Sequence, residues 1–305
     1  MVTRFAVTTT RVVILIGVVG ALAMIRAARQ VVRAYQIERS SLSPPVGTVL
    51  LPSDAATLGL QPIVIPNGDD RIGAWYARPH GGGTVVLCTG TNATRASLLA
   101  EARALIAGGH GVVLFDWPGH GESSGAVEWG DPARRALRAV LLATSQLPGA
   151  DSTRIGVFAF SFGGVTAVPE VAHTSNVRAL AIVATPLDPW EQIRYEYAGG
   201  GSFAIEGARL FWRRRGEDFV RLRVAPEAIG LGARPVLVVT GVDDHTVDPA
   251  DAARLVDIIG PSAQLWRIQG AGHGGYASVT PKYGPRLAAF FTRTLAPPHD
   301  TSNAP

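Results

Sequence analysis

Residues 154–164 read RIGVFAFSFGG, and this stretch decides the fold. It begins as a compact apolar run, which predicts a buried strand, and continues into small residues typical of a tight turn into a helix. Ser161 stands at the turn, with Ala159 two residues before it and Gly163 two residues after it. Because a strained turn of this kind brings neighbouring backbone close, only small side chains avoid collision. We therefore expect the Ser161 hydroxyl at the carboxyl end of a central strand, beside the positive end of a helix.

Apolar runs and helical segments alternate on both sides of this stretch. We predict strands at 84–88, 111–115, 154–159, 177–184, 234–240 and 264–268, and helices at 96–107, 132–146, 163–172, 249–259 and 282–294. This alternation predicts an alpha/beta domain with a mostly parallel central sheet and helices on both faces. Two extended runs, 61–66 and 72–78, flank the sequence Asn-Gly-Asp-Asp and predict an antiparallel hairpin in front of the parallel strands.

One segment interrupts the alternation. Residues 187–231 carry aromatic side chains, arginines and a run of three glycines, and they predict a small inserted helical cap. The simpler interpretation is that the aromatic residues pack as a core beneath this cap. The alternative is a lid whose aromatic face admits an acyl chain and whose arginines meet anionic groups.

The chain divides into four parts by composition. We assign residues 1–42 to an N-terminal hydrophobic helix and the start of a linker, 43–54 to a proline-rich linker, 55–295 to the alpha/beta domain with its cap, and 296–305 to a disordered tail. The 305 residues are 47% hydrophobic with a mean hydropathy of +0.20, which excludes disorder for most of the chain.

Charge and cysteine content exclude further classes. The chain has 28 Lys and Arg against 24 Asp and Glu, a net charge of +4, and the charges look scattered rather than massed. We therefore expect no nucleic acid partner. The single cysteine, Cys88, excludes an internal disulfide and a multi-cysteine zinc site, and its place at the end of a buried run favours a small core residue over a nucleophile. We expect neither a metal ion nor an organic cofactor.

The N-terminus contains an uncharged apolar run, VVILIGVVGALAMI at residues 12–25, with arginines on both flanks. We predict an uncleaved single-pass membrane anchor, although the run is shorter than the about 20 residues that usually cross a bilayer. A signal peptide cleaved near Ala21–Ala23, giving a secreted protein, is the first alternative, and a soluble amphipathic helix is the second. The arginines on both sides leave the orientation open.

Two downstream loops supply the partners that a serine nucleophile needs. A serine needs a base, and the base needs a carboxylate to hold its tautomer. Asp244 follows one predicted strand in the sequence GVDDHTV, and His273 follows the next in GAGHGG. Asp243 is the rival for the acid, since one residue of slippage would exchange the two. His120 and His245 lie in the same set of loops, where we expect His120 at most to line a pocket and His245 not to act.

The order Ser161, Asp244, His273 and the segments around them resemble the alpha/beta-hydrolase fold superfamily, in its serine hydrolase branch of esterases, lipases and serine-aminopeptidase-like proteins. Residues 116–125, DWPGHGESSG, are similar to the DxxGxGxSxG segment of that family. The resemblance covers residues 55–295 and implies a catalytic triad of Ser161, His273 and Asp244. It also implies an oxyanion hole made by the backbone N–H groups of Phe162 and Thr91.

Two positions depart from the family pattern. Ala159 stands where the family usually has glycine, and Thr89 stands where it usually has a histidine before Gly90. Neither departure removes a group of the triad, but the missing histidine bears on Thr91 as a donor.

The resemblance implies a serine hydrolase that cleaves a carboxylic ester, or a thioester or amide, through an acyl-enzyme intermediate. The expected substrate is a small-molecule or lipid-like acyl compound, and the expected further partner is a membrane that holds the N-terminal helix. Two alternatives stay open: an acyltransferase that uses the same acyl-enzyme, and a non-catalytic hydrolase-like binding module at the membrane. The sequence does not define the oligomeric state.

Overall fold

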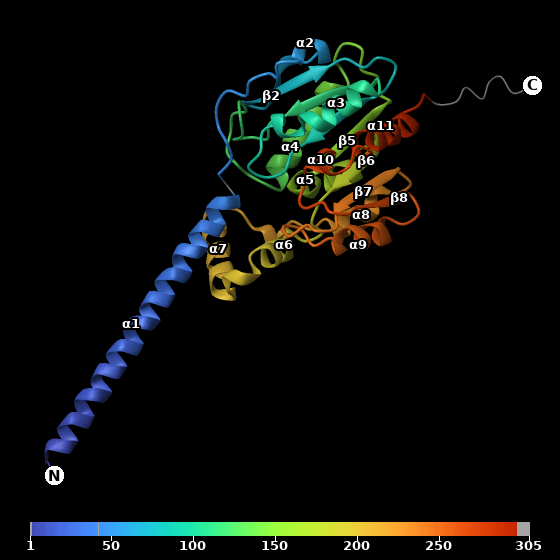
Figure 1. Cartoon of the computed structure of the whole chain (residues 1–305). Helices are drawn as coiled ribbons and strands as arrows, with labels where there is room; N and C mark the ends of the chain where they lie inside the picture. The colour runs from blue at the N-terminus through green and yellow to red at the C-terminus, as the bar shows by residue number, and fades with distance from the viewer. Residues whose placement is uncertain (1, 42, 298–305) are drawn as a thin grey trace, which may run out of the picture. The chain divides into compact units, whose positions relative to one another are not determined.

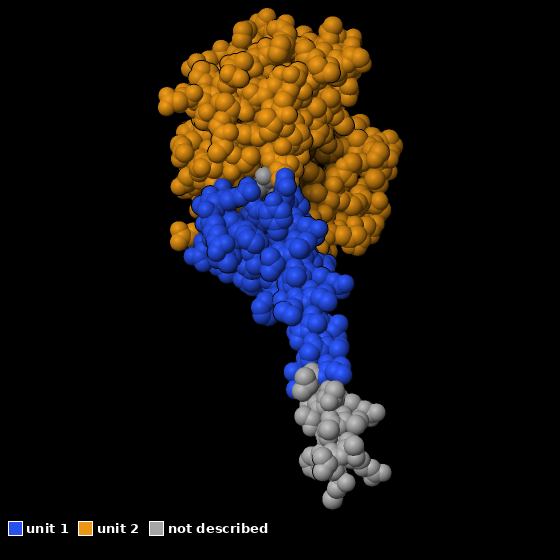
Figure 2. Space-filling view, turned by 90° about the vertical axis from the view of Figure 1, so that its left-hand side faces the viewer, with its two compact units in different colours: residues 1–41, 197–218 blue, residues 42–196, 219–305 orange. Residues whose placement is uncertain are grey.

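A computed structural model of the protein describes residues 2–41 and 43–297, so most of the predicted tail at 296–305 lies outside the described residues. The chain forms two compact units, coloured separately in Figure 2. Unit 1 comprises residues 1–41 and 197–218, and unit 2 comprises residues 42–196 and 219–305. The N-terminal helix therefore groups with a segment that lies inside the predicted cap.

Unit 2 is built on an eight-stranded sheet with the strand order β1-β2-β4-β3-β5-β6-β7-β8 (Figure 1). The strands are β1 (Gln61–Asn67), β2 (Asp70–Ala77), β3 (Thr84–Cys88), β4 (Gly111–Phe115), β5 (Ile155–Phe160), β6 (Val177–Val183), β7 (Val236–Gly241) and β8 (Ala263–Ile268). The pairs β1–β2 and β2–β4 are antiparallel, and the other neighbours are parallel. This confirms the predicted hairpin and the mostly parallel sheet.

The burial of each strand follows from its place in the sheet. Every residue of the central strands β3, β4 and β7 is buried, as expected for strands covered by helices on both faces. The edge strand β1 is mostly accessible and contains Pro62 and Pro66. Because proline offers no N–H to a neighbouring strand, these residues are tolerated at an edge and hinder pairing with another chain.

Helices cover both faces of the sheet. Contacts between elements place α3 and α11 on one face and α4, α5, α8 and α9 on the other. The helices of unit 2 are α2 (Ala55–Leu58), α3 (Leu99–Ala107), α4 (Asp131–Thr144), α5 (Phe162–Ala172), α6 (Pro189–Glu196), α8 (Ala225–Ala228), α9 (Ala250–Ile259), α10 (Tyr276–Val279) and α11 (Tyr283–Thr294), with short 3-10 turns at Arg95–Leu98, Phe219–Arg221 and Ile229–Leu231. Side chains such as Leu87, Phe158 and Phe291, which are fully buried, form the core between these layers.

Unit 1 is a helical pair. It contains α1 (Val2–Ser41), a 3-10 turn at Ala198–Gly200 and α7 (Ser202–Arg214). The two helices are close enough that a Cβ on Gly207 would lie 2.8 Å from the Cβ of Ala34, and the rings of Tyr35 and Phe211 meet edge to face at 6.3 Å between centroids. The small residue at this crossing lets the two backbones approach.

The helix α1 is longer than the apolar run that predicted it. Residues Ile14–Ser40 are long and apolar enough to cross a membrane, with a mean hydropathy of 1.6 and none of the apolar window buried. The same test is passed by a signal sequence near an N-terminus. Helix α1 itself extends beyond the apolar run at 12–25 into turns that contain arginines and that pack on α7.

The expectation that charges are scattered is wrong at the level of the two units. Unit 1 has ten basic and four acidic residues, a net charge of +6, whereas unit 2 has eighteen basic and twenty acidic residues, a net charge of −2. The excess positive charge of the protein is therefore carried by unit 1. The sequence alone does not indicate this separation of charge between the units, because the two segments of unit 1 are more than 150 residues apart in the chain.

Candidate active site

Ser161 lies at the turn between β5 and α5, in a conformation that is rare for a residue with a side chain. Its φ is 52° and its ψ is −123°. The backbone holds it there, since its N–H donates to the Val183 carbonyl at 2.8 Å and its carbonyl accepts from the Thr185 hydroxyl at 3.0 Å. Strain of this kind persists only where the surroundings fix it, and it is common at functional sites.

The small residues around Ser161 are needed for close approach, as the sequence predicts. A Cβ on Gly163 would lie 2.5 Å from the Thr89 carbonyl oxygen and 2.7 Å from that of Cys88. Ala159 is fully buried at its position in β5. The turn is therefore packed directly against the end of β3, where larger side chains would collide.

A continuous chain of hydrogen bonds links the three predicted triad residues. The distance from His273 Nε2 to Ser161 Oγ is 3.0 Å, and the distance from His273 Nδ1 to Asp244 Oδ2 is 2.8 Å. Asp244 is 1% exposed, and its Oδ1 accepts from the N–H groups of Thr246 and Val247 at 2.8 and 2.9 Å. The carboxylate thus has fixed partners on both oxygens and can orient the imidazole.

The structure separates the two aspartates that the sequence leaves as rivals. Asp244, and not Asp243, contacts His273, while the Asp243 side chain is exposed. The Asp243 backbone N–H donates to the Ala271 carbonyl at 2.9 Å, which ties the acid loop to the histidine loop. The catalytic role of Asp244 stays a prediction, but its geometry is the one that such a role requires.

The loop that follows β3 lies against the serine. A Cβ on Gly90 would be 3.1 Å from Ser161 Cβ, and the Trp117 indole N–H donates to the Thr89 carbonyl at 2.9 Å. Thr91 is the next residue of this loop, and Phe162 is the first residue of α5. Helix N-termini present N–H groups without intrahelical partners, so the predicted donor Phe162 comes from a suitable element, whereas Thr91 lies in a turn and is placed only by the close approach of Gly90 to the serine.

The linker holds this same loop. The Ser43 N–H donates to Asn92 Oδ1 at 3.0 Å, and Asn92, directly after Thr91, has a φ of 53°. Farther along, the Gly47 N–H donates to the Gly121 carbonyl at 2.9 Å, and the Gly121 N–H donates to the Pro45 carbonyl at 2.8 Å. Residues that read as a proline-rich linker are thus bonded to two loops of the alpha/beta domain.

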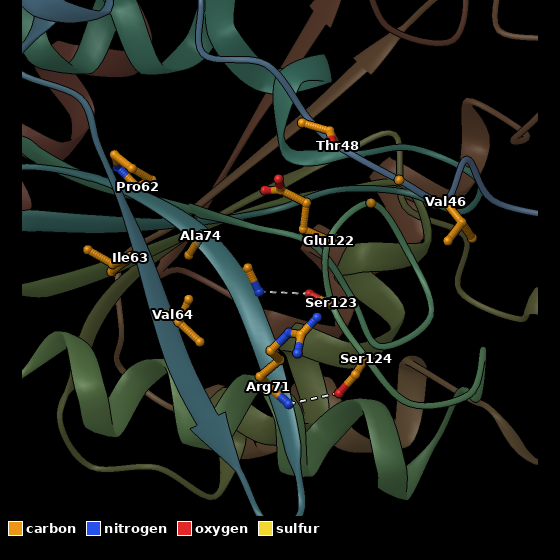
Figure 3. A pocket seen from close by; sticks show the side chains of 13 residues that line it. Val46, Thr48, Pro62, Ile63, Val64, Arg71, Ala74, Glu122, Ser123 and Ser124 are labelled. Carbon is orange, nitrogen blue, oxygen red and sulfur yellow. Dashed lines mark hydrogen bonds between the residues drawn. The ribbon is translucent and has the colours of Figure 1, made fainter.

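The segment DWPGHGESSG at residues 116–125 is fixed to β2 by its serines. In Figure 3 the Ser123 and Ser124 hydroxyls accept from the N–H groups of Gly73 and Arg71, at 3.0 and 2.9 Å. These residues border an open pocket of about 750 Å³ that is also lined by the linker and β1. Asp116 begins the segment and forms a buried ion pair with Arg95, which is 1% exposed. Because Arg95 follows the loop that carries Thr91 and its backbone N–H also donates to Asp116 Oδ1, this network ties that loop to the segment at residues 116–125.

Helix α6 contributes contacts to the acid loop that the sequence did not indicate. The Tyr195 hydroxyl donates to the Asp244 carbonyl at 3.0 Å. The Gln192 amide donates to the Thr246 carbonyl at 3.2 Å and to the Glu196 carboxylate at 2.7 Å. Because the surrounding protein reduces its hydration, the pKa of Glu196 is raised, although the hydrogen bond from Gln192 and the nearby His273 oppose this shift. The end of α6 therefore lies beside the triad.

Aromatic rings surround the nucleophile and the histidine. The rings of Phe160 and His273 are 5.0 Å apart between centroids. Phe162, directly after the serine, packs edge to face on Trp129 at 4.7 Å and on Phe219 at 5.4 Å. Phe162, Trp129 and Phe219 are buried, so these rings exclude water from one side of the nucleophile and lower the local dielectric.

The remaining candidates of the sequence lie apart from this chemistry. Cys88 is fully buried, and burial raises the pKa of its thiol. His120 is also buried, its Nδ1 lies 2.9 Å from the Pro118 carbonyl, and burial lowers its pKa. His245 is exposed. Within residues 2–41 and 43–297, no group of three or more His, Cys, Asp or Glu side chains is arranged to hold a metal ion.

Sequence comparisons place part of the chain in a known family. A sequence model of the alpha/beta hydrolase fold matches residues 83–205. The polyketide synthase ThaQ of Burkholderia thailandensis is 46% identical over 61 residues, which are 20% of this chain and 3% of the synthase. An uncharacterized protein of Mycobacterium tuberculosis is 28% identical over 246 residues, which cover 75% of this chain and 78% of that protein.

Solved structures share the fold at low sequence identity. An esterase of Pyrococcus furiosus aligns with a TM-score of 0.67 at 19% identity, over 83% of this chain and 100% of the esterase. The alpha/beta hydrolase GrgF of a Penicillium species aligns at 0.65 and 15% identity, over 78% and 99% of the two chains. A serine hydrolase without a lid from Xanthomonas campestris aligns at 0.55 and 18% identity, over 81% and 97%. Because the sequence model and these structures agree on one architecture, the chain has the alpha/beta-hydrolase fold, and its residues 83–205 match the sequence model of that family.

Proposed function

We propose that this protein is a serine hydrolase that cleaves a carboxylic ester, or a thioester or amide, through an acyl-enzyme intermediate. The observation that carries the proposal is the hydrogen-bond chain from Asp244 through His273 to Ser161, with distances of 2.8 and 3.0 Å. A serine held at positive φ on a strand-to-helix turn, with a histidine and a buried carboxylate in line, is the arrangement that activates a hydroxyl as a nucleophile.

The proposed reaction has two halves. Ser161 Oγ attacks the carbonyl carbon while His273 Nε2 takes its proton, and the tetrahedral intermediate collapses as His273 returns that proton to the leaving alcohol, thiol or amine. A water molecule then attacks the acyl-enzyme, again with His273 as base, and releases the acid with Ser161 restored. Asp244 keeps its charge throughout, and it stabilises the imidazolium.

The oxyanion of each tetrahedral intermediate is assigned to the N–H groups of Phe162 and Thr91. Phe162 begins α5, and Gly90 beside Thr91 approaches the serine closely. One such donor contributes roughly 3 kcal/mol to the transition state in other hydrolases. The preference for an ester also draws on the structural relative from Pyrococcus furiosus, which is an esterase.

The test uses the full-length protein in a mild detergent and a fluorophosphonate probe that reacts with activated serines. We expect labelling of the wild type and of Ser145→Ala, a partly exposed serine in the turn after α4 that serves as the control, and no labelling of Ser161→Ala. Hydrolysis of p-nitrophenyl esters of increasing acyl length then measures the size of the acyl site. A folded wild-type protein that takes up no probe would reject the proposal in favour of a binding module.

We also propose that α1 anchors the protein in a membrane as a single span. Its support is the exposed apolar surface of α1 over Ile14–Ile25 and the length of Ile14–Ser40. Alkaline carbonate extraction of cells that express the full chain should leave the protein in the pellet. Its intact mass should include residues 1–23, whereas a mass lacking them would establish cleavage of a signal peptide.

A further inference from the structure

Several arginines of unit 1 are exposed and lie on one side of each of its helices. On α1, Arg26, Arg29 and Arg33 are exposed and follow one another at spacings of three and four residues, which places them on one side of the helix. Ile25 and Val32 lie on the same side, and the residues Ile25, Ala28, Arg29, Val32, Arg33 and Gln36 line one shallow hollow. This stripe of α1 therefore mixes arginines with aliphatic side chains.

Helix α7 shows the same mixture. Phe203 is 84% exposed and Leu210 is 52% exposed. Because their positions differ by seven, or about two helical turns, they lie on the same side of the helix. The exposed Arg213 and Arg214 extend the same side toward the helix end. Two other arginines of the unit are engaged within it, Arg209 with Glu206 at 3.6 Å and Arg215 with Glu38 at 2.8 Å.

The position of the arginines along α1 indicates what they meet. The exposed apolar stretch Ile14–Ile25 directly precedes Arg26. A helix that leaves the hydrocarbon region of a bilayer at this point carries its next two turns through the headgroup layer, because each residue advances about 1.5 Å along the axis. Arginines at that depth extend their guanidinium groups to phosphates while their aliphatic stems stay in apolar surroundings.

We propose that unit 1 binds the headgroup layer of an anionic phospholipid membrane. Its binding surface comprises Arg26, Arg29 and Arg33 of α1 together with Phe203, Leu210, Arg213 and Arg214 of α7. Charge complementarity argues for this partner, since the part of unit 1 after the apolar span, residues 26–41 and 197–218, has eight basic and four acidic residues, a net charge of +4, while unit 2 is slightly negative. Exposed aromatic and leucine side chains beside arginines are the composition of helices that lie in a membrane interface.

The covalent connections of unit 1 give this surface a consequence for the proposed reaction. The chain leaves unit 2 after Glu196, at the end of the helix that contacts the acid loop, and returns at Phe219, which packs on Phe162. Both connections therefore start beside the triad. Under the proposed function, a lipid-bound unit 1 would keep the enzyme at the membrane, where amphiphilic acyl compounds collect.

The test compares lipid headgroups while the anchor stays sheltered. The full-length protein in a neutral detergent is titrated with short-chain phosphatidylglycerol and with short-chain phosphatidylcholine. We expect the anionic lipid to bind more tightly, with an affinity that falls as salt rises. In the variant Arg26→Gln, Arg29→Gln, Arg213→Gln, Arg214→Gln the affinity for phosphatidylglycerol should fall at least about tenfold, since each arginine near an anionic surface contributes favourably.

A matched variant controls for net charge. Arg135→Gln, Arg267→Gln, Lys282→Gln and Arg293→Gln remove four exposed positive charges from unit 2 and should leave lipid affinity within about twofold of the wild type. Equal affinity for the two lipids, or an equal loss in the control, would overturn the proposal. So would salt-sensitive binding of duplex DNA that is tighter than binding of phosphatidylglycerol. Fluorophosphonate labelling of the same samples reports separately on the proposed chemistry.

Discussion

At the scale of single residues, Asp243 and Asp244 share their chemistry and differ in their partners. Asp244 is buried and has hydrogen-bond partners on both carboxylate oxygens, whereas Asp243 faces solvent. A charged carboxylate is costly to bury unless hydrogen bonds compensate it, and here the two backbone N–H groups and the imidazole do so. The difference gives a direct comparison of two neighbouring positions.

We expect Asp244→Asn to reduce kcat for a p-nitrophenyl ester by about 10⁴-fold, because the amide would hold the His273 ring in the wrong tautomer. Asp243→Asn should change kcat less than about threefold, as expected for an exposed side chain. Steady-state kinetics of the two variants beside the wild type provide the measurement. Equal losses would mean that the hydrogen bond to His273 is not what matters.

Gly163 offers a test of the close packing behind the nucleophile. In Gly163→Ala the added Cβ would meet the backbone carbonyls of Cys88 and Thr89, which cannot rotate away. Overpacking of this kind costs about 1–3 kcal/mol of unfolding free energy, and it should also displace Ser161 and reduce activity. Gly199→Ala is the control, since no atom lies within 4 Å of its added Cβ. Urea unfolding of both variants measures the difference.

The residues whose proximity could be predicted from the sequence are those that follow strands. Ser161, Asp244 and His273 each lie in the turn or loop that follows one of the parallel strands β5, β7 and β8, so topology alone places them at one edge of the sheet. Tyr195 and Gln192 come from a helix with no such constraint, and only the tertiary structure shows that they contact the acid loop. Local sequence patterns hold no signal for contacts of this kind.

At the scale of elements, the linker behaves as part of unit 2. Its backbone is bonded to Asn92 and to Gly121, and its Val49 carbonyl accepts from the Arg95 guanidinium at 3.4 Å. Asn92 is the informative member, because it adjoins Thr91 and adopts a left-handed φ that asparagine tolerates better than most residues. The bond from Ser43 therefore restrains the loop that supplies an oxyanion donor.

We expect Asn92→Gly to lower kcat by about tenfold with a smaller change in KM, because glycine accepts the backbone angle but removes the acceptor for Ser43. Asn92→Asp keeps an acceptor oxygen and should retain most of the activity. Kinetic constants with a fixed ester distinguish the two. If both variants retain wild-type kcat, the linker does not position this loop.

At this scale, the sequence predicted the bounds of strands best where every residue of the strand is buried. The predicted strands at 84–88 and 111–115 have the bounds of β3 and β4, since apolar runs between polar turns define strands that are covered on both faces. The single-turn helices α2 and α10 escaped prediction, because four residues carry no helical period and owe their conformation to tertiary packing. The grouping of α1 with α7 was not predictable either, because the two helices are separated by residues 42–196 and only the tertiary structure brings them together.

At the scale of the whole molecule, two histidines buried in unit 2 link stability to pH. His110 and His120 are each 1% exposed, and burial lowers the pKa of both below the ordinary value of 6.5. The folded state therefore holds them neutral, while the unfolded chain takes up protons below about pH 6.5. Their contribution to stability is present above that pH and is lost as the pH falls.

We expect the free energy of unfolding of the wild type to fall more steeply between about pH 8 and pH 5 than that of His110→Gln, His120→Gln, which has no group to protonate at these positions. Urea unfolding curves at several pH values give the two slopes. The carboxyl groups are the same in both proteins, so the difference isolates the histidines. Parallel pH dependences would show that these rings become protonated without opening the fold.

The pairing of α1 with α7 also decides how the protein can be produced. Deleting residues 1–42, the usual way to make a membrane-anchored enzyme soluble, would remove the partner of a helix that stays in the chain. Gly207 and Phe211 on α7 would lose Ala34 and Tyr35 and would join an apolar surface that favours aggregation. We expect a chain that begins at Arg26 to be recovered as a monodisperse protein where one that begins at Ser43 precipitates, since the shorter deletion removes the apolar span and keeps the helical pair.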